Sequence, residues 1–322
     1  MNPVVKILNT IGDVYTQGAK EILEEVGDVD YKILTQDNLL ESIGEYEIAV
    51  IGLGLSFMKD VLEKAEKLKI IATATTGLDH IDVKFAKLKG ITVLSLRGEN
   101  DFLDTITGTA ELAWGLLIDV VRLTPWAFDN VKEYKWEREK FRGHNLYGKT
   151  LGIVGMGRLG KWMARYGKAF GMNVLYCDPN INLSTSDVDR LWKRVEFGEL
   201  LENSDVVSVH VHLTSETENM FSPKTISQMK KGAYLINTSR GKIVDEGALL
   251  GLLKNGHLGG YGTDVLADEL YFEKGFKDHP LVEYAKGHKN VVIVPHIGGM
   301  TIESRERTDI FIAEKIKRFV QK

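Results

Sequence analysis

Residues 151–160, Leu-Gly-Ile-Val-Gly-Met-Gly-Arg-Leu-Gly, constrain the fold of this chain more than any other segment. An apolar strand pattern runs into Gly155, Gly157 and Gly160, which have the spacing G-x-G-x-x-G, and a helix pattern follows. In this spacing the first glycine permits a tight turn, the second lets a pyrophosphate approach the backbone, and the third lets the helix pack on the strand. The helix N-terminus adds N–H groups and the positive end of a dipole. The segment therefore predicts a dinucleotide-binding turn.

A second apolar run, Asn-Val-Leu-Tyr-Cys-Asp at 173–178, ends in Asp178, 18 residues after Gly160. An acid at this place can accept hydrogen bonds from the ribose hydroxyls of an adenosine, and it repels a 2′-phosphate. A glycine pattern alone is weak, but one framed by a strand, a helix and a strand-ending acid is specific. We therefore expect the chain to bind NAD rather than NADP.

The whole chain alternates short apolar runs with charged, helix-periodic stretches, a pattern typical of parallel sheets covered by helices on both faces. We expect strands at 4–8, 31–34, 48–53, 70–75 and 91–94, and a second series of six at 150–154, 173–177, 205–211, 233–237, 259–263 and 291–294. Long helices are expected over 107–123 and 301–320. The six strands that start from the glycine turn match a doubly wound nucleotide-binding sheet. The sequence thus predicts the α/β class.

Composition narrows the partners and the compartment. The 322 residues suffice for two domains, and a formal charge of −4 argues against nucleic acid and anionic membranes as partners. Cys177 is the only cysteine, so no internal disulfide can form, which fits a reducing cytoplasm. The N-terminus lacks a signal-peptide pattern, and no apolar run reaches the roughly 18 residues of a membrane span. Because no Cys, His or carboxylate set has metal-ligand spacing, we expect no metal.

Residues 126–144 are unusually rich in aromatic and charged side chains. The aromatic ones are Trp126, Phe128, Tyr134, Trp136 and Phe141. A surface helix followed by an arm would account for this pattern, and so would a subunit contact, since interfaces favour Trp, Tyr and Arg. Both interpretations stay open at the level of the sequence.

Four side chains at the ends of predicted strands are suited to hydride-transfer chemistry. Arg240 carries a permanent, forked charge that can bind a 2-keto or 2-hydroxy carboxylate. His296 can give and take a proton near neutral pH, and Glu269 could hold its other ring nitrogen. Asp264 could accept a hydrogen bond from a nicotinamide carboxamide. Each residue alone could be a surface or packing residue, but all follow strands of the sheet that carries the glycine turn.

Three motifs carry a resemblance to a known family. They are the segment 136–178 around the glycine turn, Asn237-Thr-Ser-Arg-Gly241, and Pro295-His296. On these motifs the chain resembles the D-isomer-specific 2-hydroxyacid dehydrogenases, which include NAD-dependent, phosphoglycerate dehydrogenase-like enzymes, along nearly its whole length. The resemblance implies that Arg240, Glu269 and His296 are the catalytic residues. It also implies a Rossmann cofactor domain at 105–296, inserted in a flavodoxin-like substrate domain at 1–104 plus 297–322, with a cleft between them.

The resemblance further implies which residues bind the ligands, and that the protein is a homodimer. The expected NAD-binding residues are Thr109, Gly155, Gly157, Arg158, Leu159, Gly160, Asp178, His210, Thr238, Ser239, Arg240, Asp264, His296 and Gly298. The expected substrate-binding residues are Thr76, Gly77, Arg97, Arg240 and His296. The physiological acid stays open, because phosphoglycerate, glycerate, glyoxylate and branched keto acids all fit the pattern.

The chain departs from the family pattern at few places. His212 stands where proline is usual, Leu270 replaces a common proline, and 270–277 resembles an added loop. Two other functions stay open: a phosphite or formate dehydrogenase on the same scaffold, and an NAD-sensing, corepressor-like binding protein. Glu269 disfavours a formate enzyme, in which Gln is expected there. The chain ends one helix after His296, so we expect no regulatory extension.

Overall fold

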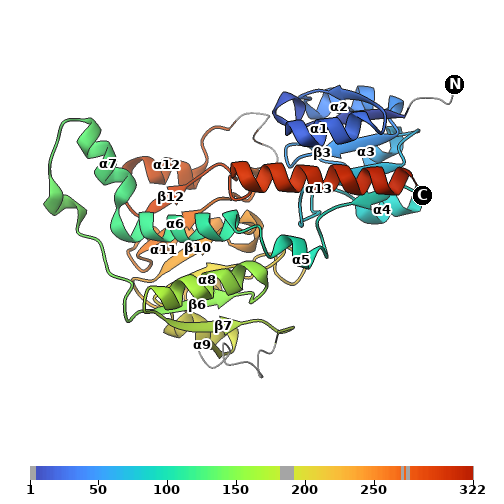
Figure 1. Ribbon diagram of the computed structural model, residues 1–322. Coiled ribbons are helices and arrows are strands. Elements are labelled where there is room, and N and C mark those ends of the chain that lie inside the picture. Colours follow the sequence, from blue (N-terminus) through green and yellow to red (C-terminus); the bar gives the residue numbers. More distant parts are fainter. Residues whose placement is uncertain (1–4, 182–191, 270–271, 273–275, 322) are drawn as a thin grey trace. The chain divides into compact units, whose positions relative to one another are not determined.

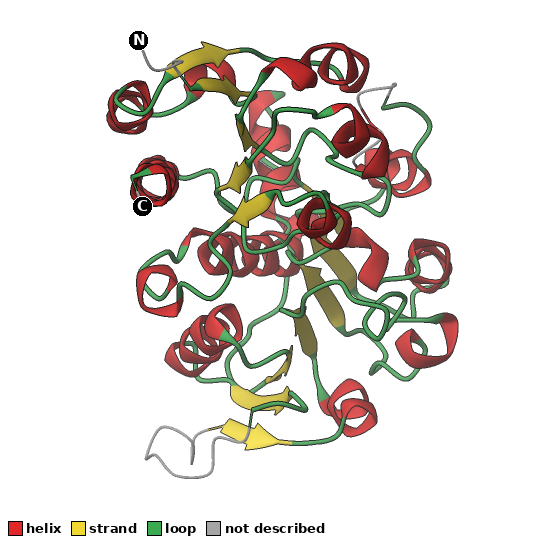
Figure 2. Ribbon diagram, turned by 90° about the vertical axis from the view of Figure 1, so that its right-hand side faces the viewer, coloured by secondary structure: helices red, strands yellow, loops and turns green. Residues whose placement is uncertain are grey.

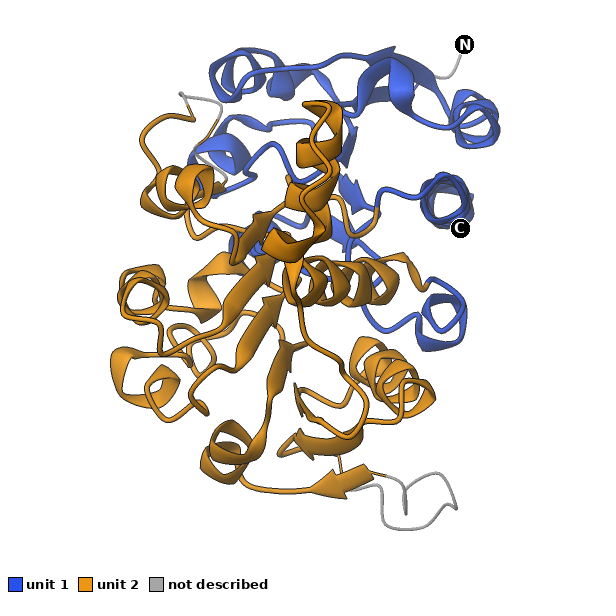
Figure 3. Ribbon diagram, turned by 90° about the vertical axis from the view of Figure 1, so that its left-hand side faces the viewer, with its two compact units in different colours: residues 1–106, 300–322 blue, residues 107–299 orange. Residues whose placement is uncertain are grey.

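The computed structural model describes residues 5–181, 192–269, 272 and 276–321. The chain forms two compact units (Figure 3): unit 1 is Met1–Ile106 with Met300–Lys322, and unit 2 is Thr107–Gly299. The sequence placed the corresponding boundaries after residues 104 and 296. Of the expected added loop at 270–277, residues 270–271 and 273–275 lie outside the described part of the chain.

Unit 1 contains a parallel five-stranded sheet in the order β2-β1-β3-β4-β5, one of the two common doubly wound orders. Its strands are β1 (Lys6–Asn9), β2 (Asp28–Tyr31), β3 (Ile48–Ile51), β4 (Ile70–Thr73) and β5 (Thr92–Leu94). Helices cover both faces (Figure 2), because alternate residues of the buried strands point to opposite sides. Ile7 packs into the core under α1 (Gln17–Glu24) and α13 (Ile302–Val320). Its neighbour Leu8 packs into the core under α2 (Gln36–Ser42), α3 (Lys59–Lys64) and α4 (Val83–Leu88).

The expected strand at 31–34 is wrong in position. Strand β2 runs from Asp28 to Tyr31 at the edge of the sheet, and it pairs with β1 through Lys6↔Asp28 to Asn9↔Tyr31. The apolar pattern after Tyr31 misled the assignment, since Ile33 is 81% exposed. An edge strand is paired on one side only, so burial leaves a weaker apolar pattern in its sequence.

Unit 2 contains a parallel seven-stranded sheet in the order β12-β11-β10-β9-β6-β7-β8. Its strands are β6 (Thr150–Val154), β7 (Asn173–Cys177), β8 (Trp192–Arg194), β9 (Val206–Val209), β10 (Tyr234–Asn237), β11 (Gly260–Thr263) and β12 (Val291–Ile293). In chain order this is the dinucleotide-binding arrangement 3-2-1-4-5-6 with one more strand beside the sixth. The count of six strands was therefore one too low, and β8 is the strand that the sequence did not indicate. The order reverses between β6 and β9, where ligands bind in such sheets.

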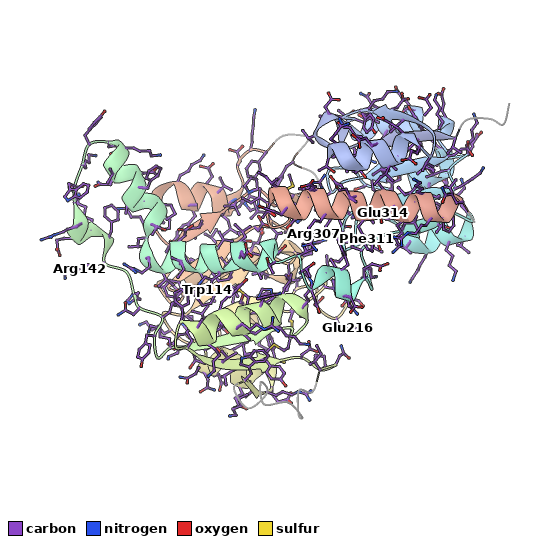
Figure 4. All side chains as sticks on the ribbon, viewed as in Figure 1. Trp114, Arg142, Glu216, Arg307, Phe311 and Glu314 are labelled. Atoms are coloured by element: carbon purple, nitrogen blue, oxygen red, sulfur yellow. The ribbon has the colours of Figure 1, made fainter. Side chains whose placement is uncertain are left out.

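Two layers of helices cover the sheet of unit 2 (Figure 1). Helices α6 (Gly108–Arg122) and α8 (Arg158–Ala169) lie on one face. On the other face lie α9 (Phe197–Asn203), α10 (Pro223–Ile226), α11 (Glu246–Lys254) and α12 (Pro280–Gly287). Helix α6 is rich in Ala, Leu, Ile and Val, packs on α8 and β11, and is followed by the C-cap Leu123, which has a left-handed φ of 58°. Trp114 on α6 contacts Tyr166 and Phe170 (Figure 4).

The segment 126–144 contains a surface helix followed by an irregular arm. Helix α7 (Thr124–Lys132) has no buried residue, and the short 3₁₀ helix η3 (Arg138–Phe141) lies farther along the arm. The exposed fractions are 65% for Phe128, 101% for Tyr134 and 83% for Trp136. Figure 1 shows this arm projecting from the helices of unit 2. The structure thus leaves several large aromatic side chains of the arm in solvent.

Helix α13 packs against residues 95–105, the last segment of unit 1 before the chain enters unit 2. Phe311 stacks on Phe102 of α5 (Asn100–Leu103) with ring centroids 4.1 Å apart, and Arg307 donates to the carbonyl of Thr105 at 3.0 Å (Figure 4). Lys315 donates to the carbonyl of Ser95 at 2.9 Å. The chain leaves unit 1 after Ile106 and returns to it at Met300. These contacts therefore hold residues 95–105, which precede the exit from unit 1, against helix α13. No helix of the described residues has the length and apolar character needed to cross a membrane.

Candidate active site

The three glycines after β6 form a tight turn that leads into α8. Gly155 has a φ of +93°, and a Cβ there would lie 2.5 Å from the His210 carbonyl oxygen. A Cβ on Gly160 would collide with the Gly155 carbonyl, which brings α8 close to the turn. Gly157 is the N-cap of α8, and a Cβ there would meet nothing within 4 Å. The backbone is therefore tightly packed at Gly155 and Gly160, whereas the space at Gly157 is open. Arg158 and Leu159 begin α8 at this open end.

Asp178, directly after β7, is fixed beside this turn. Its Oδ2 accepts a hydrogen bond from Met156 N at 2.9 Å, and its Oδ1 accepts one from Asn180 N at 2.9 Å. Met156 lies between Gly155 and Gly157, so the carboxylate is joined to the glycine turn itself. A carboxylate oxygen can accept more than one hydrogen bond, and the assignment to ribose binding therefore stays compatible with these contacts.

Buried polar atoms without a protein partner lie at the ends of β9 and β10, the central strands of the sheet. His210 Nε2 is 2.8 Å from Ser208 Oγ, whereas His210 Nδ1 and Thr238 Oγ1 have no partner within the described residues. Burial lowers the pKa of His210 to about 4, so its ring is neutral at physiological pH. Ser239 donates to the Val209 carbonyl at 2.8 Å and ties the two strand ends together. Since buried polar groups are normally satisfied, these atoms fit a polar ligand at this edge.

Asp264, at the end of β11, organises the turn that carries His296. Its two carboxylate oxygens accept hydrogen bonds from Ile297 N at 2.6 Å and Gly298 N at 2.8 Å. Burial raises the pKa of Asp264 to about 6, although the two N–H donors lower it. Thr109 of α6 lies against Gly298, where a Cβ would be 3.1 Å from the threonine methyl. Asp264 thus positions the His296 backbone, which is a role the sequence did not indicate.

The structure brings His296 and Glu269 together across 27 residues of chain. Nδ1 of His296 lies 2.8 Å from Oε1 of Glu269, and both side chains are about three-quarters buried. His296 has a left-handed φ of 53°, and its N–H donates to the Asp264 carbonyl at 2.9 Å. With Nδ1 held by the carboxylate, Nε2 is the ring nitrogen that can exchange a proton with a ligand.

Arg240 follows β10 in the same unit. Its Nη1 donates to the Ser239 carbonyl at 2.8 Å, and its own carbonyl accepts from Asn237 Nδ2 at 2.9 Å. The next residue, Gly241, lies against the Leu266–Ala267 peptide so closely that a Cβ would be 2.5 Å from the Leu266 oxygen. The strand end with Arg240 and the loop with Glu269 are therefore packed backbone to backbone.

The other predicted substrate-binding residues belong to unit 1. Thr76 and Gly77 follow β4, where Thr75 Oγ1 donates to the Gly77 carbonyl at 2.8 Å and shapes the turn. Arg97 follows β5 and is exposed, and its N–H donates to Ser95 Oγ at 3.2 Å. Within the described residues, no group of three or more His, Cys, Asp or Glu side chains has a metal-binding arrangement.

A doubly wound sheet with a glycine turn, a strand-ending acid and a His–Glu pair defines a nucleotide-dependent oxidoreductase class. Comparison with known families gives the particular one. The family model described as "D-isomer specific 2-hydroxyacid dehydrogenase, NAD binding domain" matches residues 114–298. This chain belongs to the D-isomer-specific 2-hydroxyacid dehydrogenase family, and its unit 2 contains the NAD-binding domain.

Individual relatives agree with this assignment. The chain is 37% identical over 319 residues to a D-3-phosphoglycerate dehydrogenase of Methanocaldococcus jannaschii, covering 99% of this chain and 58% of the relative. It is 38% identical over 291 residues to a glyoxylate reductase of Thermococcus litoralis, covering 88% and 83%. A solved D-lactate dehydrogenase from Aquifex aeolicus, complexed with NAD and lactic acid, superimposes with a TM-score of 0.84 at 29% identity, covering 98% and 95%. The chain spans little more than half the length of the phosphoglycerate dehydrogenases that it matches.

Proposed function

We propose that this protein is an NAD-dependent dehydrogenase that interconverts a small D-2-hydroxy acid and the corresponding 2-keto acid. The observation that carries the proposal is the 2.8 Å contact between His296 and Glu269 in the unit that holds the glycine turn. Membership in the family and relatives named as phosphoglycerate, hydroxypyruvate and glyoxylate enzymes support the same reaction class.

The residues at the carboxyl edge of the unit 2 sheet are suited to holding the cofactor. The glycine turn would receive the pyrophosphate, Asp178 the ribose, and the unpartnered atoms of His210 and Thr238 other polar groups of NAD. When bound, the nicotinamide supplies or accepts the hydride. The protein contributes binding, orientation and the management of one proton.

That proton belongs to His296. In the direction of reduction, Nε2 of the protonated ring gives its proton to the carbonyl oxygen of the keto acid, and in oxidation it takes the hydroxyl proton back. Glu269 fixes the tautomer and the orientation of the ring through Nδ1. Arg240 would bind the carboxylate and the reacting oxygen through its guanidinium, which offers two parallel N–H donors. Thr76, Gly77 and Arg97 remain predicted contacts of the substrate carboxylate.

The test is the oxidation of NADH with a panel of 2-keto acids, followed at 340 nm, with NADPH in parallel. We expect at least one acid to be reduced with NADH as the preferred donor. The variant Glu269→Gln keeps the size of the side chain and should reduce kcat by ~10- to 100-fold. If wild-type protein reduces no member of the panel but binds NADH, the binding-protein alternative replaces the dehydrogenase.

We further propose that the protein is a cytoplasmic homodimer whose contact includes helix α7 and the arm that follows it, residues 124–144. The exposed aromatic side chains of this segment, including Phe128, Tyr134 and Trp136, support the contact, because Tyr, Trp and Phe are enriched in protein interfaces. Light scattering should give twice the chain mass of 36.1 kDa. The variant Trp136→Glu should shift the mass towards the monomer, and a wild-type monomer would remove the proposal.

A further inference from the structure

Glu246 connects three parts of unit 2 that are separate in the sequence. It is the first residue of α11, after the N-cap Asp245. Its Oε1 accepts a hydrogen bond from Ala267 N at 2.9 Å, and its Oε2 lies 3.3 Å from Nε2 of His279, the N-cap of α12. The exposed fractions of the two side chains are 16% and 13%. This buried pair thus joins the starts of two helices to the loop after β11.

The loop that Glu246 holds is the one that presents Glu269. Ala267 is two residues before Glu269, and Glu269 folds back so that its N–H donates to the Leu266 carbonyl at 3.4 Å. Its Oε2 accepts from Leu266 N at 3.3 Å. The backbone of Gly241 packs against the same Leu266–Ala267 peptide. The peptide is therefore fixed by backbone packing and by the hydrogen bond to the Glu246 carboxylate.

We propose that Glu246, supported by His279, is a positioning residue that sets the place of Glu269 relative to His296. The anchoring of the loop by Glu246 does not depend on the proposed function, whereas its expected effect on kcat does. A carboxylate is a stronger acceptor than water for a loop N–H, and the hydrogen bond from Ala267 N to Glu246 restrains the loop that carries Glu269, the residue in contact with His296.

The surroundings of Glu246 favour a role as a hydrogen-bond acceptor that positions the loop, and this role does not require a negative charge. Burial raises the pKa of the Glu246 carboxyl, while the Ala267 N–H and His279 oppose this rise, and Asp268 adds to it. His279 also lies beside the rings of Phe272 and Phe276, whose centroids are 6.0 and 6.4 Å from its own. What the site requires from Glu246 is an acceptor atom at a fixed place, and a neutral amide oxygen can supply it.

The experiment compares Glu246→Ala, Glu246→Gln and the control Glu283→Ala. Glu283 is also an acid in the first turn of a helix of unit 2, but it is half-exposed and pairs with Lys286. We expect Glu246→Ala to lower kcat by ~10- to 100-fold, since a displacement of about 1 Å can cost this much. The dissociation constant of NADH, measured by fluorescence, should stay within about twofold, because the glycine turn is untouched. Glu246→Gln should restore most of kcat, and Glu283→Ala should have wild-type kcat.

Hydrogen exchange measured by mass spectrometry provides a readout that does not depend on turnover. The peptide covering 262–269 should exchange at least ~10-fold faster in Glu246→Ala than in wild type or in Glu246→Gln, because the Ala267 N–H loses its acceptor. Wild-type exchange rates in Glu246→Ala would overturn the anchoring. Faster exchange with unchanged kcat would show an anchor without consequence for catalysis and would also overturn the proposal. An inactive wild type with the expected exchange pattern would refute the proposed function and leave the anchor of Glu269 in place.

Discussion

The substitution Gly241→Ala tests how tightly the loop with Glu269 must pack on the strand end with Arg240. A Cβ at position 241 would lie 2.5 Å from the Leu266 carbonyl oxygen and still closer to Leu266 C and Ala267 N. All three atoms belong to the backbone, so no change of rotamer can relieve the overlap. Since ordinary contacts begin at 3.4 Å and the nearest atom, Leu266 C, would lie 2.1 Å away, the two segments would have to separate by about 1.3 Å.

This separation sets the size of the expected effects. Inserting one methyl group into a packed site costs ~1–3 kcal/mol in the free energy of unfolding. The larger consequence is kinetic, because a misplacement of about 1 Å between reacting groups can lower the rate by ~100-fold. Glu269 and His296 must stay 2.8 Å apart, and Arg240 is the neighbour of the substituted residue. We therefore expect kcat to fall by ~30- to 100-fold in a protein that is still folded.

Kinetics with a keto acid that the wild type reduces, together with urea unfolding, separate these two effects. The control is Gly251→Ala in α11, where a Cβ would meet nothing within 4 Å. This exposed helix position should gain ~0.5–1 kcal/mol of stability and keep its activity. If folded Gly241→Ala protein has a kcat within threefold of wild type, the backbone contact does not set the active geometry.

Three further predictions follow from single groups. His296→Asn should lower kcat by ~1,000-fold and leave NADH affinity, measured by fluorescence, nearly unchanged; turnover near the wild-type level would remove His296 as the acid–base group. Asp178→Ser should narrow the preference for NADH over NADPH in steady-state assays, and a wild-type preference for NADPH would contradict the role of Asp178. Burial raises the pKa of Asp309 from 3.8 to about 6, so its favourable contribution to stability is complete below about pH 4 and is lost as the pH rises through about 6. Between pH 4 and pH 7.5, the free energy of unfolding of wild type, measured with urea, should therefore fall by up to ~3 kcal/mol more than that of Asp309→Asn. Equal falls in the two proteins would contradict the raised pKa of Asp309.

Every strand that pairs on both sides was placed from the sequence. Of the four strands at sheet edges, β5 and β12 were also placed, whereas β2 and β8 were not. The predicted strands 150–154 and 173–177 coincide with β6 and β7, whose apolar runs reflect burial between neighbours. Strand β8 has only the residues Trp192–Arg194 and pairs with β7 alone. Strand β2 likewise pairs only with β1. The edge strands β5 (Thr-Val-Leu) and β12 (Val-Val-Ile) are apolar and could be recognised, whereas β2 (Asp-Val-Asp-Tyr) and β8 (Trp-Lys-Arg) have charged residues at half or more of their positions.

Parts of the active site also differ in how well the sequence predicted them. The glycine turn is a local pattern, so its conformation followed from residues 155–160 directly. The approach of Glu269 to His296 depends on two strand ends meeting, and only the general rule for parallel sheets placed both at one edge. The contacts of Asp264 and Glu246 with backbone N–H groups had no signal in the sequence, because Asp245-Glu246 indicates only a helix start. Roles that operate through backbone hydrogen bonds become visible only once the chain is folded.

These backbone contacts determine whether the His–Glu pair exists before any ligand binds. A left-handed φ of 53° at His296 is unfavourable for a residue with a side chain, costing ~1 kcal/mol or more. It persists because Asp264 accepts hydrogen bonds from three successive backbone N–H groups: its carbonyl oxygen accepts from His296, and its carboxylate accepts from Ile297 and Gly298. Glu269 is held separately, through the peptide between Gly241 and Glu246. Two independent anchors therefore meet at one 2.8 Å contact, so the groups need no reorganisation during proton transfer.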